Sequence, residues 1–269
     1  GCSFGAYHSS LSSSLPAARL TGNLTLVTDA IVQEIVYDPA TGKASGVRVT
    51  DANTMVGTTY EARVIFSCAS AIGTAQILLN SKSEAFPTGL ANRSDQVGRN
   101  LMDHLYALSV AGVLPNGPNT TTFGRRPTGL YVPRFRNVTE EGRDYLRGYG
   151  YQGGADRVGW RSSAVSQPGI GAELKQRTRR PGPWFVRLSG FGEILPYADN
   201  RVTLNANARD KWGIPTPHIS FDFGQNGRNM AKQIIEDGRA MLETMGFTVT
   251  SVGKVPGTPG LGIHEMGTA

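Results

Sequence analysis

The chain has 269 residues, of which 39% are hydrophobic and 18% are charged, and it carries a formal net charge of +6. This balance indicates a globular protein and excludes an intrinsically disordered one. No apolar run approaches the roughly 20 residues that span a bilayer, so we expect a soluble protein, cytoplasmic or periplasmic if its source is bacterial.

The first part of the chain predicts an antiparallel meander. Residues 24–28, 31–37 and 46–50 alternate in hydrophobicity or run in β-branched side chains, which is typical of strands. Turn-forming residues follow each of the last two runs. A fourth strand is expected to begin near Thr59 and to become buried over 63–66.

A helix follows this expected buried strand through a run of very small residues. Ser67, Cys68, Ala69 and Ser70 connect the two elements, and Ser70 is predicted to be the N-cap of the helix. Small side chains at a helix N-terminus allow a ligand to approach the backbone, but they equally allow tight packing of helix on strand. The pattern alone leaves both interpretations open.

The second part of the chain predicts β-rich structure with one long helix. Residues 82–102 are expected to be a loop, and patterning is weak from Asn116 to Thr178. Residues 226–245 predict a helix that ends at Gly246, with a buried stripe formed by Met230, Ile234, Met241, Leu242 and Met245. Further strands are expected over 184–188, 201–204, 219–223 and 248–252.

Residues that bind metals or form disulfides are sparse. Cys2 and Cys68 are expected to be reduced thiols. The four histidines have no partner at metal-ligand spacing, so no metal site is predicted; they are His8, His104, His218 and His264.

Four segments of the chain form a recognisable series. Residues 15–24 include Leu-Pro-Ala-Ala followed by Gly-Asn-Leu, and residues 63–81 lead through the small residues to Leu-Leu-Asn-Ser. Residues 97–104 are Val-Gly-Arg-Asn-Leu-Met-Asp-His, and residues 264–269 are His-Glu-Met-Gly-Thr-Ala. In this order the series resembles the signatures of the glucose–methanol–choline (GMC) oxidoreductases, whose catalytic histidine lies in a His-x-x-Gly-Thr motif.

The resemblance implies an FAD cofactor and roles for individual residues. Val32 is expected to offer its backbone to the adenine end of FAD, and Cys68 and Ala69 are expected to lie beside the dinucleotide. The family often has Gly where this chain has Ala69. His264 is the implied catalytic residue. An imidazole titrates near neutrality, so it can take up the hydroxyl proton while a hydride leaves the alcohol carbon.

The resemblance also implies an architecture of α/β plus α+β type. Residues 1–103 are expected to form the middle part of an FAD-binding Rossmann-like domain. Residues 104–262 are expected to form a substrate-binding domain with an antiparallel sheet backed by helices, and residues 263–269 begin the final catalytic segment. On this interpretation the FAD pyrophosphate loop and a second catalytic residue lie outside an interior fragment. The chain alone is then expected to bind FAD weakly and to be inactive.

The expected activity is oxidation of a CH–OH group by an FAD-dependent dehydrogenase or oxidase. A sugar or polyol is favoured as the substrate, and the electron acceptor is unknown. The alternatives are a non-catalytic carbohydrate-binding β-rich module, a degenerate homologue of the family, and a nucleic-acid-binding protein. The last depends on the basic segment Lys175–Arg180, which we otherwise interpret as a solvated loop.

Overall fold

The computed structural model describes residues 7–120, 129–139, 143–158, 167–179, 182–253 and 256–269. The chain divides into two compact units. Unit 1 consists of Gly1–Ile65 together with Arg209–Ile214, and unit 2 consists of Phe66–Ala208 together with Pro215–Ala269. The predicted domain boundary after residue 103 is a different division of the chain, and it stays a prediction.

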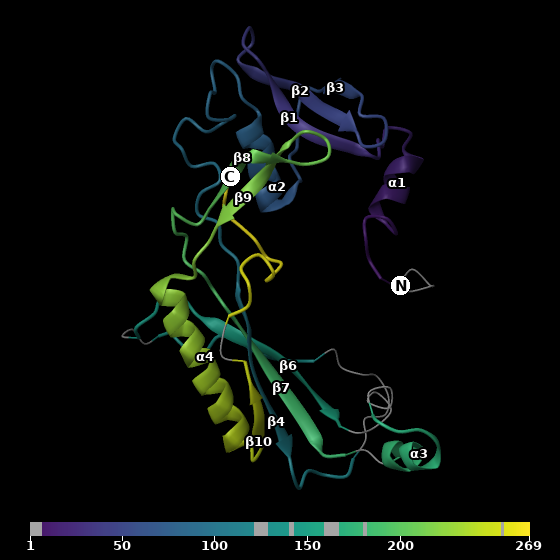
Figure 1. The fold of residues 1–269 in the computed structure, drawn as a ribbon, viewed down its shortest axis with the longest axis vertical. Helices are drawn as coiled ribbons and strands as arrows, with labels where there is room; N and C mark the ends of the chain where they lie inside the picture. Colours follow the sequence, from purple (N-terminus) through teal and green to yellow (C-terminus); the bar gives the residue numbers. More distant parts are fainter. Residues whose placement is uncertain (1–6, 121–128, 140–142, 159–166, 180–181, 254–255) are drawn as a thin grey trace. The chain divides into compact units, whose positions relative to one another are not determined.

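Unit 1 is built on a three-stranded antiparallel meander (Figure 1). A short helix, α1 (Ser14–Leu20), precedes β1 (Ala30–Asp38), β2 (Lys43–Asp51) and β3 (Gly57–Glu61). These strands confirm the predictions over 31–37 and 46–50.

The strand expected to begin near Thr59 is present as β3, but it ends at Glu61, so its predicted extension over 63–66 is wrong, as is the strand predicted over 24–28. Residues 24–28 and residues 63–66 are not strands, and the second segment is not buried, since Phe66 is 84% exposed. A strand is stable only when a neighbour pairs with its backbone N–H and carbonyl groups. Within the described ranges neither segment has a strand partner, so β-propensity alone does not make it extended.

Unit 2 contains the helix α2 (Ser70–Asn80) and a five-stranded antiparallel sheet in the order β10-β4-β7-β6-β5. A separate two-stranded sheet is formed by β8 and β9. The remaining bounds are β4 (Leu105–Leu114), β5 (Leu130–Val132), β6 (Tyr149–Arg157), α3 (Gly171–Arg179), β7 (Trp184–Gly192), β8 (Arg201–Arg209), β9 (Pro215–Ser220), α4 (Gly224–Thr244) and β10 (Thr248–Val252).

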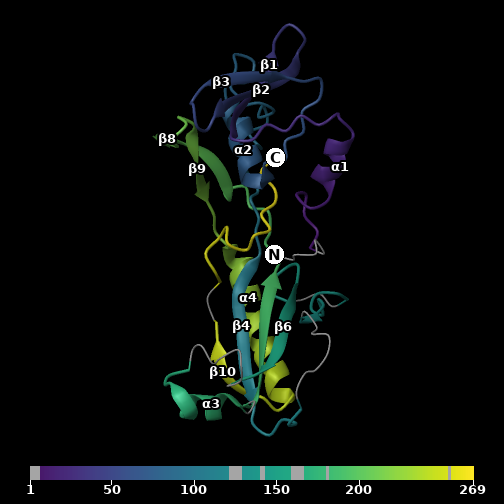
Figure 2. The same cartoon turned by 90° about the vertical axis from the view of Figure 1, so that its right-hand side faces the viewer.

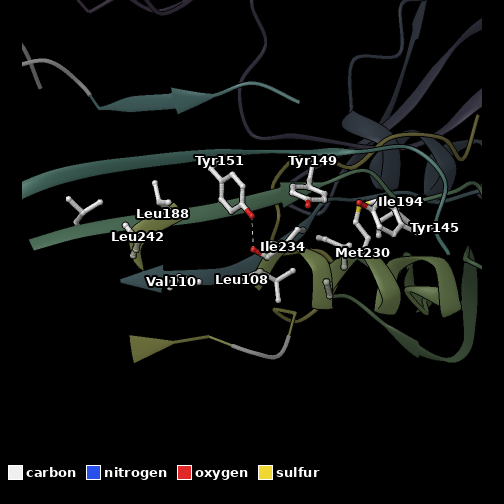
Figure 3. Close-up of a cluster of buried hydrophobic side chains, with 13 residues drawn as sticks. Leu108, Val110, Tyr145, Tyr149, Tyr151, Leu188, Ile194, Met230, Ile234 and Leu242 are labelled. Carbon is white, nitrogen blue, oxygen red and sulfur yellow. Dashed lines mark hydrogen bonds between the residues drawn. The ribbon is translucent and has the colours of Figure 1, made fainter. Parts of the chain in front are cut away.

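The long helix α4 packs along one face of the five-stranded sheet (Figures 1 and 2). It can approach closely because β7 carries Gly190, where a Cβ atom would lie only 2.2 Å from Ile234. Figure 3 shows the resulting core, in which Tyr151 of β6 donates a 2.6 Å hydrogen bond to the carbonyl oxygen of Ile234. The largest fully buried side chains of this core are Tyr151, Leu105, Leu108, Met230, Ile234, Leu242 and Val110.

The predictions for this unit are partly confirmed. The helix expected over 226–245 and the strand over 248–252 are present, and Gly246 ends the helix with a φ of +82°. Met245 is not part of the buried stripe, because it lies beyond the last helical residue and is 55% exposed. The strand expected over 219–223 lies earlier, at β9.

The weakly patterned region holds regular structure that was not expected. Strand β6 was missed because three of its nine residues are glycines, which disfavour strands. The sheet forms there nonetheless, because β6 pairs along its whole length with β7. The basic segment expected to be a loop is the exposed helix α3 up to Arg179, while Arg180 lies outside the described residues. Glu173 in its first turn and Arg177 in its last turn favour that helix.

Candidate active site

The segment that carries His264 pairs with the segment that ends in His104. Met102 and Met266 form an antiparallel bridge, with N···O distances of 2.9 and 3.0 Å. The pairing continues at Thr268, whose N–H donates to the carbonyl oxygen of Arg99 at 3.0 Å. Two motifs that lie about 160 residues apart in the sequence are therefore neighbours in unit 2.

The glycine of the His-Glu-Met-Gly-Thr segment allows this close approach. Gly267 has a φ of +87°, and a Cβ atom there would lie 2.1 Å from the carbonyl oxygen of Asn100. Any larger residue would therefore push the two segments apart. Thr268 then buries its side chain, with 2% of the residue exposed, and donates a hydrogen bond to the carbonyl oxygen of Ala71 at 2.7 Å.

Asp103 holds the backbone at His104 and in the loop that precedes His264. One carboxylate oxygen accepts the N–H of His104 at 2.7 Å. The other accepts the N–H groups of Gly260 and Gly262, at 3.0 and 2.9 Å. Asp103 is only 4% exposed, so its charge is compensated by these three donors. The carboxylate thereby ties the loop that precedes His264 to the start of β4.

His104 and His264 face each other edge to face. Their ring centroids are 4.9 Å apart, and the ring planes are inclined at 80°. Phe191 of β7 contacts the His104 ring in the same manner, with centroids 6.2 Å apart. His264 itself is exposed. The packing therefore orients the catalytic candidate and leaves it open to a small molecule.

Both histidines line a cavity of about 260 Å³. Gln152 lines the cavity from the sheet face opposite to α4, because side chains alternate along β6 and its neighbour Tyr151 points toward α4. Tyr149, whose hydroxyl binds Asp237 of α4, lines the cavity as well. Further polar side chains line it, namely Tyr131, Arg134, Gln152 and Glu193. Donors, acceptors and two imidazoles in one small cavity suit a polar substrate that gives up a proton.

A larger cavity, of about 720 Å³, lies on the α4 side of the sheet. Its walls are largely apolar, with side chains such as Leu130, Val132, Phe135 and Met241. Its charged groups are Arg136 and Asp237, which bind each other. The smaller cavity is therefore the better candidate for chemistry.

Comparison with known proteins agrees with the motifs. The GMC oxidoreductase family model matches residues 1–106. The 2-methyl-1,2-propanediol dehydrogenase of Mycolicibacterium austroafricanum is 29% identical over 250 residues, which cover 90% of this chain and 44% of that protein. The fructose dehydrogenase large subunit of Gluconobacter japonicus is 25% identical over 230 residues, which cover 86% and 41%.

The chain is therefore similar to the GMC oxidoreductases, and the match to their family model lies in residues 1–106. It spans less than half the length of the two relatives. The family is FAD-binding, which confirms the predicted cofactor. None of the helices described in the structure is long and apolar enough to cross a membrane.

The residues before α2 fit the GMC flavin cofactor. Cys68, a free thiol, and Ala69 are both exposed, while Cys2 lies outside the described residues. Ala69, not Ser70 as predicted, is the N-cap, and no side chain caps the helix. Ser70 instead has a φ of +64°. Small neighbours and an uncapped first turn leave backbone N–H groups available for a phosphate or a polar ring edge.

Val32, the third residue assigned to FAD, lies in β1 of unit 1. It pairs with Val49 of β2 and is 36% exposed. A register irregularity follows it, between Val32 and Glu34. The resemblance assigns to Val32 a main-chain contact with FAD, at a point where the strand pairing changes register.

A charged network behind the cavity was missed in the sequence. Asp237 of α4 accepts hydrogen bonds from Tyr149 at 2.5 Å and from Arg136 at 2.7 and 2.8 Å. Burial works to raise the pKa of Asp237, but the hydrogen bonds from Arg136 and Tyr149 hold it below its usual value. Burial, with the bond to Asp237, raises the pKa of Tyr149. One residue could have indicated this network from the sequence. Asp237 places a carboxylate on the apolar stripe of α4, seven residues after Met230, where a charged group needs a partner.

Proposed function

We propose that this chain provides the substrate-facing part of an FAD-dependent oxidoreductase that transfers a hydride from a CH–OH group to flavin. The observation that carries the proposal is His264 lying against His104 in a small polar cavity. In this proposal residues 1–103 belong to the flavin domain, residues 104–262 to the substrate domain, and residues 263–269 begin the catalytic segment.

His264 is the proposed catalytic residue. Its exposed imidazole accepts a hydrogen bond from the substrate hydroxyl and takes up the proton as the carbon is oxidised. FAD, when bound, would supply the acceptor for the hydride. Asp103 and the pairing of Met102 with Met266 hold the backbone on either side of the imidazole, so little reorganisation is needed during the reaction.

Val32, Cys68 and Ala69 are the proposed contacts of FAD. The exposed small residues at the uncapped α2 N-terminus support the last two assignments. The assignment of Val32 follows from the resemblance to the GMC oxidoreductases.

A sugar or polyol is the proposed substrate class. Two relatives support it by their names, since one acts on a propanediol and the other on fructose. The polar lining of the cavity supports it independently. The volume of about 260 Å³ lies just below the roughly 300–1,000 Å³ that is usual for ligand pockets, which favours a small substrate.

The test is anaerobic reduction of the flavin in the holoenzyme that contains this chain, mixed with sugars, polyols and simple alcohols. Following flavin absorbance alone removes the need to know the electron acceptor. We expect His264→Ala to slow flavin reduction by about 10²- to 10⁴-fold while FAD remains bound. The control is His218→Ala, which changes an exposed histidine outside the cavity. Equal reduction rates in the two variants would contradict the proposal.

A further inference from the structure

We propose that Glu193, Arg134 and Gln152 form a hydroxyl-binding subsite that makes the enzyme prefer substrates with several hydroxyl groups. The inference rests on the proposed function and assigns its specificity to named side chains. All three line the cavity that contains His104 and His264.

Glu193 is held in the cavity wall by its backbone. It follows the last residue of β7, and its N–H donates to the carbonyl oxygen of Gly148 at 3.1 Å. Its carboxylate lies 3.6 Å from a guanidinium nitrogen of Arg134, and 47% of its side chain is exposed. The remaining lone pairs of the carboxylate are therefore accessible from the cavity.

Arg134 is oriented by the chain around it. Its Nε donates to the carbonyl oxygen of Arg136 at 3.1 Å, and one Nη donates to that of Asn137. A Cβ atom at Gly148 would lie only 2.6 Å from the Cδ of Arg134, so the side chain of Arg134 can take this position only because residue 148 is a glycine. The other Nη faces Glu193. The ion pair of Arg134 with Glu193 is exposed and therefore adds little to the stability of the fold. Stability alone thus does not explain why the guanidinium is held in one orientation.

Gln152 adds a neutral donor and acceptor. In β6 it stands between Tyr131 of β5 and Ser189 of β7, and it is exposed. Its neighbour on the same sheet face is Gly150, where a Cβ atom would lie 3.2 Å from the Tyr131 hydroxyl. The glycine therefore keeps space beside the amide.

These groups match the chemistry of a polyol. A carboxylate accepts O–H groups, a guanidinium donates to hydroxyl oxygens, and an amide does both. A substrate with one hydroxyl engages His264 and leaves this subsite without a partner. A polyol of similar size satisfies both. The subsite thus favours the polyol through bonds to charged groups, which are the stronger kind.

The test compares glycerol with 1-propanol, which share a three-carbon skeleton, as reductants of the flavin in the holoenzyme. We expect Glu193→Gln to lower the ratio of kcat/KM for glycerol to that for 1-propanol by about tenfold, and Gln152→Leu to lower it in the same direction. Glu236→Gln makes the same chemical change on the exposed surface of α4 and should leave the ratio unaltered. Retained FAD absorbance shows that each variant is folded.

The outcomes separate the two proposals. If both cavity variants keep the ratio of Glu236→Gln, the subsite is wrong while the proposed function stands. If the unmodified enzyme is reduced by no sugar, polyol or alcohol, the proposed function is wrong, and the subsite falls with it. A lowered ratio in both cavity variants supports the subsite.

Discussion

The hydroxyl of Thr268 donates a 2.7 Å hydrogen bond to the carbonyl oxygen of Ala71. This bond joins the segment that carries His264 to the first turn of α2. Together with the pairing of Met102 and Met266, it brings three segments that the sequence marks separately into one structure.

Replacing Thr268 by the isosteric valine should lower the free energy of unfolding. The change removes one buried hydrogen bond, for which we expect a loss of about 1 kcal/mol. Urea unfolding of the protein measures this loss. Thr250→Val is the matched control, because Thr250 is exposed on β10 and its hydroxyl makes only a long hydrogen bond, of 3.4 Å, to the carbonyl oxygen of Ala111. This variant should stay within about 0.5 kcal/mol of the unmodified protein. Equal losses in both variants would show that the Thr268 bond is not stabilising.

Asp103→Asn should destabilise the loop that precedes His264. An asparagine offers one acceptor oxygen where the structure uses two, so at least one of the three N–H donors loses its partner. We expect a loss of about 1.5–3 kcal/mol. The measurement is chemical unfolding, with the exposed Asp199→Asn as the control. No difference between the two variants would argue against the bracing role of Asp103.

Substitutions at His104 should separate ring packing from ring nitrogens. The edge-to-face contact with His264 is worth about 0.5–1.5 kcal/mol, so we expect His104→Ala to lower kcat/KM by about threefold to tenfold. His104→Phe keeps an aromatic edge at the same place and should retain most of the activity. A phenylalanine variant as slow as the alanine variant would instead assign a chemical role to the His104 nitrogens.

Asp237→Asn should reduce stability and remove part of its dependence on acid. Arg136 loses its charged partner but is 32% exposed, so we expect about 3 kcal/mol, the lower end for a buried pair. The pKa of Asp237 is lower in the folded state than the usual 3.8. Its contribution is therefore present above that value and is lost as the pH falls through the folded pKa.

Unfolding curves of Asp237→Asn and of the unmodified protein, recorded from neutral pH down to acid pH, check this prediction. The difference between the two proteins should shrink as the pH falls below the usual aspartate range. A difference that stays constant to the lowest pH would show that the Asp237 carboxylate does not stay ionised in the folded protein.

Local patterns in the sequence predicted the elements whose stability is local or strongly amphipathic. Helix α4 has a clear apolar stripe and a terminal glycine, and β1 and β2 are joined by a short turn. Strand β6 was not predictable, because its glycines give no strand signal and its pairing with β7 comes from residues far along the chain. The expected buried strand over 63–66 failed for the opposite reason, since its propensity is high but it has no paired neighbour in the part of the chain that the structure describes.

Only those residues of the candidate site that belong to a recognised motif were predictable from the sequence. The resemblance identified His264, but the contact with His104 depends on the pairing of residues about 160 positions apart. Glu193, Gln152 and Arg134 belong to no motif and come together only through the register of the sheet. Residues that meet by tertiary pairing leave no periodic trace in a single sequence.

The bridge between Met102 and Met266 gives the intervening residues the character of an insertion. The chain departs from the paired stem after Met102, builds the sheet and the cavity, and returns to the stem at Met266. On the way it touches the stem once more, where the N–H of Leu101 donates to the carbonyl oxygen of Asn200, and it contributes Arg209–Ile214 to unit 1. Because closing a longer loop costs only slightly more than closing a shorter one, the stem tolerates large changes in what it encloses. Exchanging only the residues that build the five-stranded sheet and the cavity would keep the stem and would test whether the proposed substrate preference moves with them.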